Sequence, residues 1–291
     1  MLATQVSDRP RAQPKVVRPG EGECLEAFGD RVWLVLTTRD TDGQLVLIVT
    51  ETPAGSGPPL HVHAWEDELA IVQSGHYEFE VGVSRIAAGP GTVVYCPREI
   101  PHTFCVVGDE PGRLFTCLRP GGFDDFFRRS AKEFSTGAPD IRQVFRIGAE
   151  HGITFLTPEC AAYHLGQLEG GSGARGKVVR PEEGEVMAMG GNRARIILTE
   201  HDTRGHCGLI ELEAPPGFGP ALHAHSQEDE LFLVQSGRYE FHLGSDVFEA
   251  GPGTVIYAAR PVLHSFHVIS DEPGRMLILF HPSAFEEFSG P

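Results

Sequence analysis

The sequence lacks the features that would place the chain in a membrane or on a nucleic acid. No run is apolar and long enough to span a bilayer, and the segment Met1 to Lys15 is polar, without the apolar core of a signal peptide. We therefore expect a cytoplasmic protein. Positive charge is scarce, since 24 Lys and Arg face 40 Asp and Glu, which gives a net charge of −16. An excess of this sign repels phosphate backbones and anionic lipids, so we expect neither nucleic-acid nor membrane partners.

Cysteine is too sparse and too irregular to form a disulfide framework. The six cysteines include no CxxC pair, which favours reduced thiols. Glycine and proline are abundant instead, with 35 and 22 copies, and they suit short strands joined by tight turns. A hydrophobic content of 41% is enough for packed cores, and 291 residues suit two domains of ordinary size.

The chain contains a repeat with an offset of 162 residues. The segment PPLHVHAWEDELAIVQSG at 58–75 recurs as PALHAHSQEDELFLVQSG at 220–237, and twelve of these eighteen positions are identical. The same offset relates VVRP at 16–19 to VVRP at 178–181. A register kept over more than a hundred residues indicates two copies of one domain. We place the first copy at 16–138, a helical and flexible connection at 139–176, and the second copy at 177–291.

Each copy has the pattern of an all-β domain. Short runs rich in β-branched and aromatic residues alternate with Gly, Pro and Asp, as expected for a closed or sandwich β-barrel. In the first copy the predicted strands are 46–50, 69–73, 77–81, 92–96, 103–107 and 114–118. We expect helices that begin at Phe123 and Phe285, a helix between the copies at 140–151, and a flexible linker or hairpin tip at 170–176.

Histidines two residues apart in a strand point to the same face of a sheet. His61 and His63 have this spacing. Glu68 follows five residues after His63, so a turn at 64–67 must return it to the same interior, and His102 comes from a third strand. The equivalent set in the second copy is His223, His225, Glu230 and His264.

Three neutral imidazoles and one carboxylate form a mixed nitrogen and oxygen site for a divalent first-row metal. We expect up to two such ions per chain, with Fe, Mn, Ni, Co, Cu and Zn all left open, and up to two octahedral positions at each ion for substrate or oxygen. The alternative is that these histidines are ordinary polar residues of strands. However, of fourteen histidines only the six proposed ligands recur as histidine across the offset, which favours a metal site.

These residues match the two signature motifs of the cupin superfamily, which the chain resembles over nearly its whole length outside the N-terminal tail and the linker. The first motif is carried by Gly55, His61, His63, Glu68 and Gly75, and again by Gly217, His223, His225, Glu230 and Gly237. The second is carried by Gly91, Pro97 and His102, with Glu99 in place of a motif glycine; in the second copy it is carried by Gly253 and His264, with Ala259 and Pro261 in place of the motif proline and glycine. The resemblance implies two tandem jelly-roll barrels with a short helical connection, and the departures affect turns rather than ligands.

Within the superfamily, the chain resembles the quercetin 2,3-dioxygenase-like bicupins. The resemblance rests on GSGPPLHVH at 55–63, the EDEL run, and PGGFDDFF at 120–127. It implies a metal-dependent dioxygenase that acts with O₂ on a flavonol-like or other enolisable hydroxy-ketone, with Glu68 or Glu230 as both metal ligand and proton acceptor. Two other classes stay open: a metal-dependent isomerase, cyclase or lyase of secondary metabolism, and a non-catalytic bicupin that binds a small ligand. A homodimer is left open.

Three smaller expectations concern the surroundings of the ligands. Glu66 and Asp67, with their counterparts in the second copy, are expected in a solvated turn. Trp65 is expected either at a pocket mouth or as a surface aromatic. Ala70 stands where the second copy has Phe232, so the first barrel should have more room for a bulky aromatic substrate.

Overall fold

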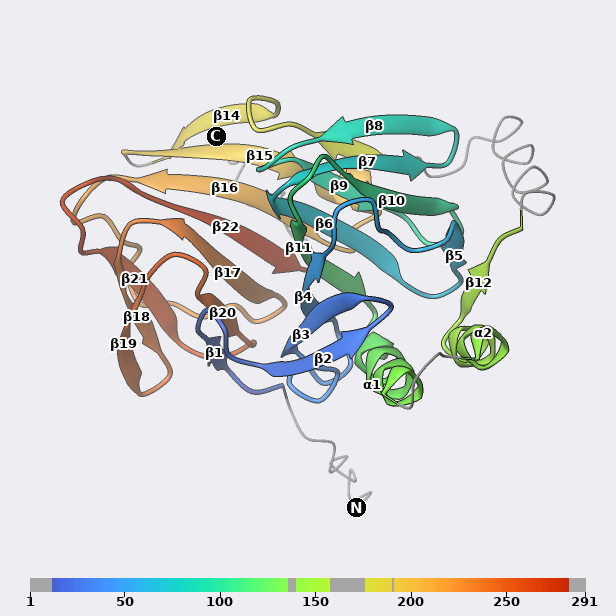
Figure 1. The fold of residues 1–291 in the computed structure, drawn as a ribbon. Helices are drawn as coiled ribbons and strands as arrows, with labels where there is room; N and C mark the ends of the chain where they lie inside the picture. The colour runs from blue at the N-terminus through green and yellow to red at the C-terminus, as the bar shows by residue number, and fades with distance from the viewer. Residues whose placement is uncertain (1–11, 136–139, 158–175, 190, 283–291) are drawn as a thin grey trace, which may run out of the picture.

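The structure is a computed structural model that describes residues 12–135, 140–157, 176–189 and 191–282. Each repeat forms one β-barrel, and the two barrels lie side by side (Figure 1). The strands of the first repeat are β2 (Glu23–Ala27), β3 (Asp30–Leu36), β4 (Val46–Thr52), β5 (His61–His63), β6 (Asp67–Ser74), β7 (His76–Val81), β8 (Ser84–Ala88), β9 (Val93–Cys96), β10 (His102–Val107) and β11 (Gly112–Arg119). All six strands predicted for this repeat are confirmed.

The second repeat has the same order of strands. They are β14 (Glu185–Met189), β15 (Asn192–Leu198), β16 (Gly208–Ala214), β17 (Asp229–Ser236), β18 (Tyr239–Leu243), β19 (Asp246–Ala250), β20 (Val255–Ala258), β21 (His264–Val268) and β22 (Gly274–His281), with a short helix α4 (Glu200–Thr203) between β15 and β16. His223 forms an isolated bridge with His264, at the place where β5 pairs with β10 in the first repeat.

The segment between the barrels is partly described and belongs to the first one. Helix α1 (Phe123–Phe134) begins where predicted, and helix α2 (Ile141–Glu150) begins after Asp140, whose side chain accepts a hydrogen bond from the Arg142 backbone N–H. The strand β12 (Ile153–Phe155), which was not predicted, pairs with β5. The helix expected at Phe285 and the linker at 170–175 lie outside the described residues.

The first strand of each repeat pairs with the sheet of the other repeat. β1 (Lys15–Val17) lies antiparallel to β20, and β13 (Lys177–Val179) lies antiparallel to β9. The two large sheets therefore run β1-β20-β17-β22-β16-β15-β14 and β13-β9-β6-β11-β4-β3-β2. In space, each barrel therefore contains a strand from the other copy.

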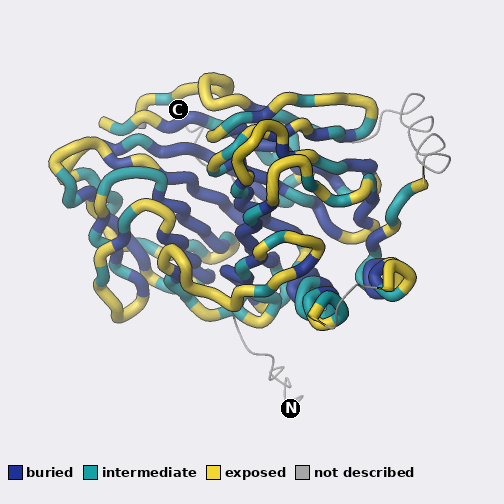
Figure 2. The backbone as a smooth tube through the Cα atoms, in the orientation of Figure 1, coloured by how far each residue is buried: buried dark blue, intermediate teal, exposed yellow. Residues whose placement is uncertain are grey.

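The two large sheets pack against each other through one shared apolar core. Leu47, Leu69 and Phe115 from the first repeat lie there with Leu209 and Leu231 from the second. Alternate residues of the same strands point instead into each barrel, so the central strands are buried on both faces, as Figure 2 shows by the dark blue segments between the barrels. This explains why β4 reads as a continuous apolar run, VLIV, rather than as an alternating pattern.

Val17 and Val179 occupy equivalent places in this shared core, and they are only 4% and 3% exposed. We expect Val17→Ala to lower the free energy of unfolding by about 1–2 kcal/mol, because it removes two buried methyl groups next to β20. Val179→Ala should have a similar effect. Val247→Ala, at a position 56% exposed on β19, is the matched control and should change stability by less than about 0.5 kcal/mol. Urea unfolding that shows equal stability for Val17→Ala and Val247→Ala would contradict the role of β1.

Candidate metal centres and the first-barrel cavity

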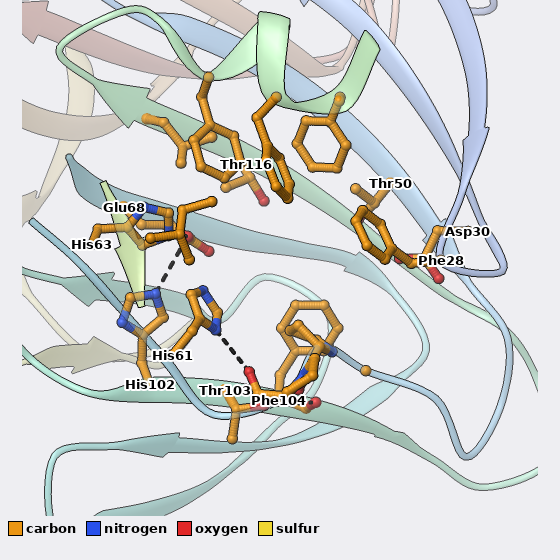
Figure 3. A pocket seen from close by; sticks show the side chains of 18 of the residues that line it. Phe28, Asp30, Thr50, His61, His63, Glu68, His102, Thr103, Phe104 and Thr116 are labelled. Atoms are coloured by element: carbon orange, nitrogen blue, oxygen red, sulfur yellow. Dashed lines mark hydrogen bonds and ion pairs between the residues drawn. The ribbon is translucent and has the colours of Figure 1, made fainter. Parts of the chain in front are cut away.

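The four predicted ligands of the first repeat meet inside its barrel. Their ligand atoms all lie within 4.8 Å of one another. His61 comes from β5 and His102 from the neighbouring β10, where the two residues are directly paired. Glu68 comes from β6 in the facing sheet, so the turn expected after His63 does return this carboxylate to the same interior (Figure 3).

Backbone and carboxylate acceptors set the orientation of each histidine ring. The Nδ1 atom of His61 donates to Pro59 O at 2.9 Å, and that of His102 donates to Ile100 O at 2.8 Å. His63 Nδ1 lies 3.3 Å from Glu66 Oε2. Because Nδ1 is engaged in each ring, the Nε2 atoms are the ones turned toward the cluster centre.

The unused Nε2 atoms fit a metal ion. Among the described residues, Nε2 of His63 and Nε2 of His102 are buried and have no hydrogen-bond partner, and each lies 3.5 Å from Glu68 Oε2. Buried polar nitrogens without a partner are costly, and lone pairs directed at one point with a carboxylate oxygen are what a divalent transition metal requires. The first repeat therefore has a complete donor set for one ion.

The electrostatics of the first cluster keep His61 and His63 neutral and Glu68 ionised, whereas the interaction with Glu68 outweighs burial and raises the pKa of His102. Burial, reinforced by the charge of His102, lowers the pKa of His63 to about 4, and burial lowers the pKa of His61 well below its usual value. Burial alone would raise the pKa of Glu68, but the close approach of His102 and the charges of His102 and His63 outweigh it and lower that pKa to about 2. A neutral imidazole and an ionised carboxylate are the forms that bind metals, so His61, His63 and Glu68 are in the binding form, and a metal ion would displace the proton that Glu68 favours on His102.

The second repeat brings its four predicted ligands together in the same way, with ligand atoms also within 4.8 Å. His264 Nε2 lies 2.8 Å from Glu230 Oε2, and His225 Nε2 lies 3.3 Å from Glu230 Oε1. Nε2 of His225 is buried and, within the described part of the chain, has no hydrogen-bond partner. The chain therefore carries donor sets for up to two divalent transition metal ions.

The altered motif turns do not displace the ligands. Glu99, which replaces the motif glycine, adopts the left-handed backbone conformation with φ 67°, and its N–H donates to His63 O at 2.8 Å. The side chain thus accepts a conformation that glycine adopts more readily. In the second repeat, Val262 N–H donates to Ala259 O at 2.8 Å in the turn that precedes His264.

The expectation that Glu66 and Asp67 lie in a solvated turn is wrong. Glu66 is 3% exposed beneath His63, and Asp67 is 6% exposed. Asp67 accepts hydrogen bonds from the backbone N–H and the guanidinium of Arg98, and lies 2.6 Å from Nδ1 of His206 in the second repeat. Both carboxylates therefore position the residues around the ligands. Trp65 is 52% exposed and packs over Gly152, so it is a surface aromatic.

A cavity of about 360 Å³ adjoins the first cluster. Its walls include residues of β3, β4, β7, β10, β11, β12 and α1. Eight of the lining residues are phenylalanines: Phe28, Phe79, Phe104, Phe123, Phe126, Phe127, Phe134 and Phe155. Neither Lys nor Arg lines it among the residues of the described ranges. Polar side chains enter at few places, among them Asp30, Thr50 and Thr116 (Figure 3).

The interior of the second barrel is filled at the corresponding positions. Across the offset, Ala70, Thr50, Thr116 and Leu118 become Phe232, Leu212, Ile278 and Phe280. All four replacements are buried in the apolar core of the second barrel, and the Phe232 ring lies 6.0 Å from the His264 ring. The difference between Ala70 and Phe232 predicted more room in the first barrel. The other three pairs of residues differ in the same direction and could have supported that prediction.

Similarity to known proteins agrees with this architecture. The model of the Cupin domain matches residues 48–118 and 210–280. This chain is a bicupin of the cupin superfamily. It is 24% identical to quercetin 2,3-dioxygenase of Bacillus subtilis over 287 residues, which is 94% of this chain and 84% of that protein. A 75-residue part, 26% of this chain, is 36% identical to an uncharacterized protein of Streptomyces coelicolor and covers 68% of it.

Solved structures share the fold of the bicupin. Oxalate decarboxylase of Lactobacillus farciminis, in its formate complex, superposes with a TM-score of 0.63 at 16% identity, over 92% of this chain and 86% of that one. Oxalate decarboxylase of Bacillus subtilis, which has Mn(II) centres, gives a TM-score of 0.62 at 18% identity, over 91% and 76%. Among the described residues of the bicupin, no helix is long and apolar enough to cross a membrane.

Two metal ions per chain are the expected content after reconstitution with Mn²⁺. His61→Ala should remove the first ion and His223→Ala the second, each with an unchanged far-UV spectrum, because the barrel cores are apolar and pack without the ion. Elemental analysis and circular dichroism check this. Wild-type protein without bound metal would contradict the sites, and loss of the far-UV signal in His61→Ala would show that the ion is structural.

Glu66 should tune metal affinity through His63. Glu66→Met removes the acceptor for His63 Nδ1 and should weaken Mn²⁺ binding at the first site about 10–100-fold. Glu66→Gln keeps an oxygen at that place and should weaken it less. Competition with a chelator in the His223→Ala background isolates the first site. Glu110→Met, on an exposed loop, is the control. If Glu66→Met bound Mn²⁺ as tightly as Glu110→Met, the role of Glu66 would be refuted.

Proposed function

We propose that the bicupin is a dioxygenase that acts on a flavonol or a similar enolisable hydroxy-ketone, and that the reaction takes place in the first barrel. One observation carries the proposal: a cavity of about 360 Å³ with phenylalanine walls ends at His61, His63, Glu68 and His102. A flat aromatic molecule fits such walls, because ring stacking and edge contacts stabilise it beyond simple burial. The likeness to quercetin 2,3-dioxygenase supports the same substrate class.

The cavity disfavours a small dianion such as oxalate, the substrate named for the structural neighbours. Two carboxylates brought into an apolar cavity need cationic or hydrogen-bonding partners to offset their lost hydration. Among the residues that the structure describes, no Lys or Arg lines the cavity, and Asp30 adds a second carboxylate beside Glu68. An aromatic hydroxy-ketone carries at most one ionised hydroxyl, and that group can lie at the histidine cluster.

Glu68 is placed to hold the proton that the substrate loses. It keeps 13% of its side-chain surface accessible and lines the cavity next to the histidines. The substrate hydroxyl at this end of the cavity would transfer its proton to Glu68, and the phenylalanines would exclude water from the resulting anion. A divalent transition metal held by the four ligands would act as a Lewis acid for the enolate and as the centre where O₂ reacts.

The second barrel keeps its ligands, but larger apolar side chains occupy its inner face. Phe232, Leu212, Ile278 and Phe280 fill the positions that are smaller or polar in the first barrel. We assign to it a supporting role, with Glu230 as a ligand and the first barrel as the site of turnover.

The experiment that tests the proposal is O₂ consumption by Mn-, Fe-, Co- and Ni-loaded protein with flavonols and diketones. Consumption of one O₂ per substrate, with both oxygen atoms recovered in the cleaved product after labelling with ¹⁸O₂, is the expected result. Substrate conversion without O₂ uptake would identify a metal-dependent isomerase or lyase. Binding without any conversion would identify a ligand-binding bicupin, and either result would overturn the proposal.

Replacement of the proton acceptor should separate catalysis from metal binding. Glu68→Gln can still offer an oxygen to the metal but does not accept a proton at neutral pH, so turnover should fall about 10²–10⁴-fold while metal content falls much less. Glu230→Gln should have the smaller effect on turnover. O₂ uptake and elemental analysis on the two variants measure this. A larger loss in Glu230→Gln would place the active centre in the second barrel.

A further inference from the structure

Four polar side chains form a diagonal row on the inner wall of the first barrel. Glu68 on β6 pairs with Leu118 on β11, and Thr116 lies two residues before Leu118 on the same strand. Thr116 pairs with Ile48 on β4, and Thr50 lies two residues after Ile48 on that strand. Thr50 in turn pairs with Val32 on β3, and Asp30 lies two residues before Val32 on that strand. The row therefore consists, in order, of Glu68, Thr116, Thr50 and Asp30. Figure 3 shows these side chains from the histidine cluster to the far end of the cavity.

Each step crosses one strand and two residues, so all four side chains face the same interior. A diagonal step of this kind separates Cα atoms by roughly 7–8 Å. Three such steps carry Asp30 beyond the reach of a one-ring molecule held at Glu68. A ligand that contacts both ends of the row must therefore contain more than one ring.

The hydroxyl groups along the row are free to bind a ligand. Among the described residues, the hydroxyls of Thr50 and Thr116 make no hydrogen bond, although both residues are buried. Asp30 Oδ2 accepts a hydrogen bond from Thr52 Oγ1 at 3.0 Å, which fixes the carboxylate and leaves its other oxygen without a partner in the described chain. Thr103, which also lines the cavity, is different, because its hydroxyl already donates to Pro58 O at 2.5 Å.

The row exists in one repeat only. The second repeat keeps Glu230, but Ile278 and Leu212 replace the two threonines, and Asn192 replaces the aspartate. Ile278 and Leu212 are buried in the core of that barrel. The metal cluster therefore does not require the row, and packing favours apolar residues at these positions. The polar groups of the first barrel need another reason, and the cavity that they line supplies it.

We propose that Asp30, Thr50 and Thr116 determine substrate specificity by binding the hydroxyl groups of a flat polyphenol of two or more rings, with Asp30 accepting a hydrogen bond from the hydroxyl farthest from the metal centre. This assignment rests on the proposed function, which places the hydroxy-ketone of the substrate at Glu68. The phenylalanines contact the faces of the rings, and the row reads the pattern of oxygens along one edge. A half-buried carboxylate such as Asp30 that lacks a full set of donors gains from a ligand that brings one.

Equilibrium binding to Mn-loaded protein without O₂ tests the assignment, because it needs no turnover. The probes are unsubstituted flavonol, galangin, kaempferol and quercetin, which add hydroxyl groups first to the fused rings and then to the pendant ring. We expect wild-type protein to bind the hydroxylated members about tenfold or more tightly than unsubstituted flavonol, as a hydrogen bond to a charged group allows. The member at which affinity rises identifies the hydroxyl that reaches Asp30.

The variants then locate the effect. Asp30→Ala should remove the preference for hydroxylated flavonols and leave the affinity for unsubstituted flavonol within about twofold. Thr50→Val and Thr116→Val, which keep side-chain size, should each reduce the preference about 2–10-fold. Asn192→Ala, the equivalent change in the second barrel, is the control and should preserve it. Asp30→Asn, with the residue found in the second repeat, gives a second test should Asp30→Ala lose its far-UV spectrum.

The outcomes separate the two proposals. Two results would overturn the role of the row and leave the proposed function standing. One is that wild-type protein binds all four flavonols equally well. The other is that the preference for hydroxylated flavonols survives in both Asp30→Ala and Asp30→Asn. If metal-loaded wild-type protein bound none of the four flavonols, the substrate class itself would fail, and the row would fail with it. Loss of preference confined to the first-barrel variants supports both.

Discussion

The exchange of first strands between the repeats is the constraint on which the rest of the structure depends. β13 pairs with β9, which pairs with β6, and there Glu68 lies opposite Cys96. By the same order, β1 pairs with β20, which pairs with β17, and there Glu230 lies opposite Ala258. Each barrel thus contains a strand of the other copy two places from its ligand glutamate. His206 of the second repeat also contacts Asp67, the residue before Glu68. A single copy would leave β9 as an open edge and Asp67 with one partner fewer, so the duplicated chain folds as one body.

The strand exchange also explains how the two copies could diverge inside while remaining alike outside. The faces that meet between the barrels must stay apolar in both copies, because they form one core. The inner faces have no such shared requirement. In the second copy they carry Phe232 and Ile278 and are closely packed; in the first they carry Ala70 and Thr116 and leave a cavity. Filling a cavity stabilises a barrel, and keeping one costs stability. A cavity that persists in one copy, beside a complete ligand set, is therefore better explained by ligand binding than by folding.

Much of this could be predicted from the sequence, and the limits have physical causes. The offset of 162 and the HxH spacing are local signals, and they led to the barrels and to both ligand clusters. The strand exchange could not be predicted, because Val16-Val17 and Val178-Val179 are equally suited to either sheet and pairing of distant strands has no local signature. The burial of Glu66 could not be predicted either: a charged residue in a turn is usually solvated, whereas here the turn is held against the segment before β12 by the hydrogen bond from Ala64 N–H to Gly152 O. The row from Glu68 to Asp30 combines residues of four strands, and only their register shows that these residues share one face.

The carboxylate of Asp30 shows most clearly how the site differs from its copy. Burial raises its pKa to about 6, against a smaller lowering by the hydrogen bond from Thr52, so the surrounding cavity disfavours its charge. At neutral pH the Asp30 carboxylate is still mostly ionised, so its partly desolvated charge lowers the stability of the folded protein. The equivalent position in the second barrel avoids this cost with Asn192. A donor from a bound hydroxyl would replace the water that burial removes, and it would lower the pKa of Asp30 again. A ligand hydroxyl would therefore gain affinity by offsetting the lost hydration of Asp30, while an apolar ring at the same place would remove more of that hydration. In a cavity walled by phenylalanine, discrimination among aromatic molecules of similar shape can come only from such polar positions, and the row supplies them at the end opposite to the metal ligands.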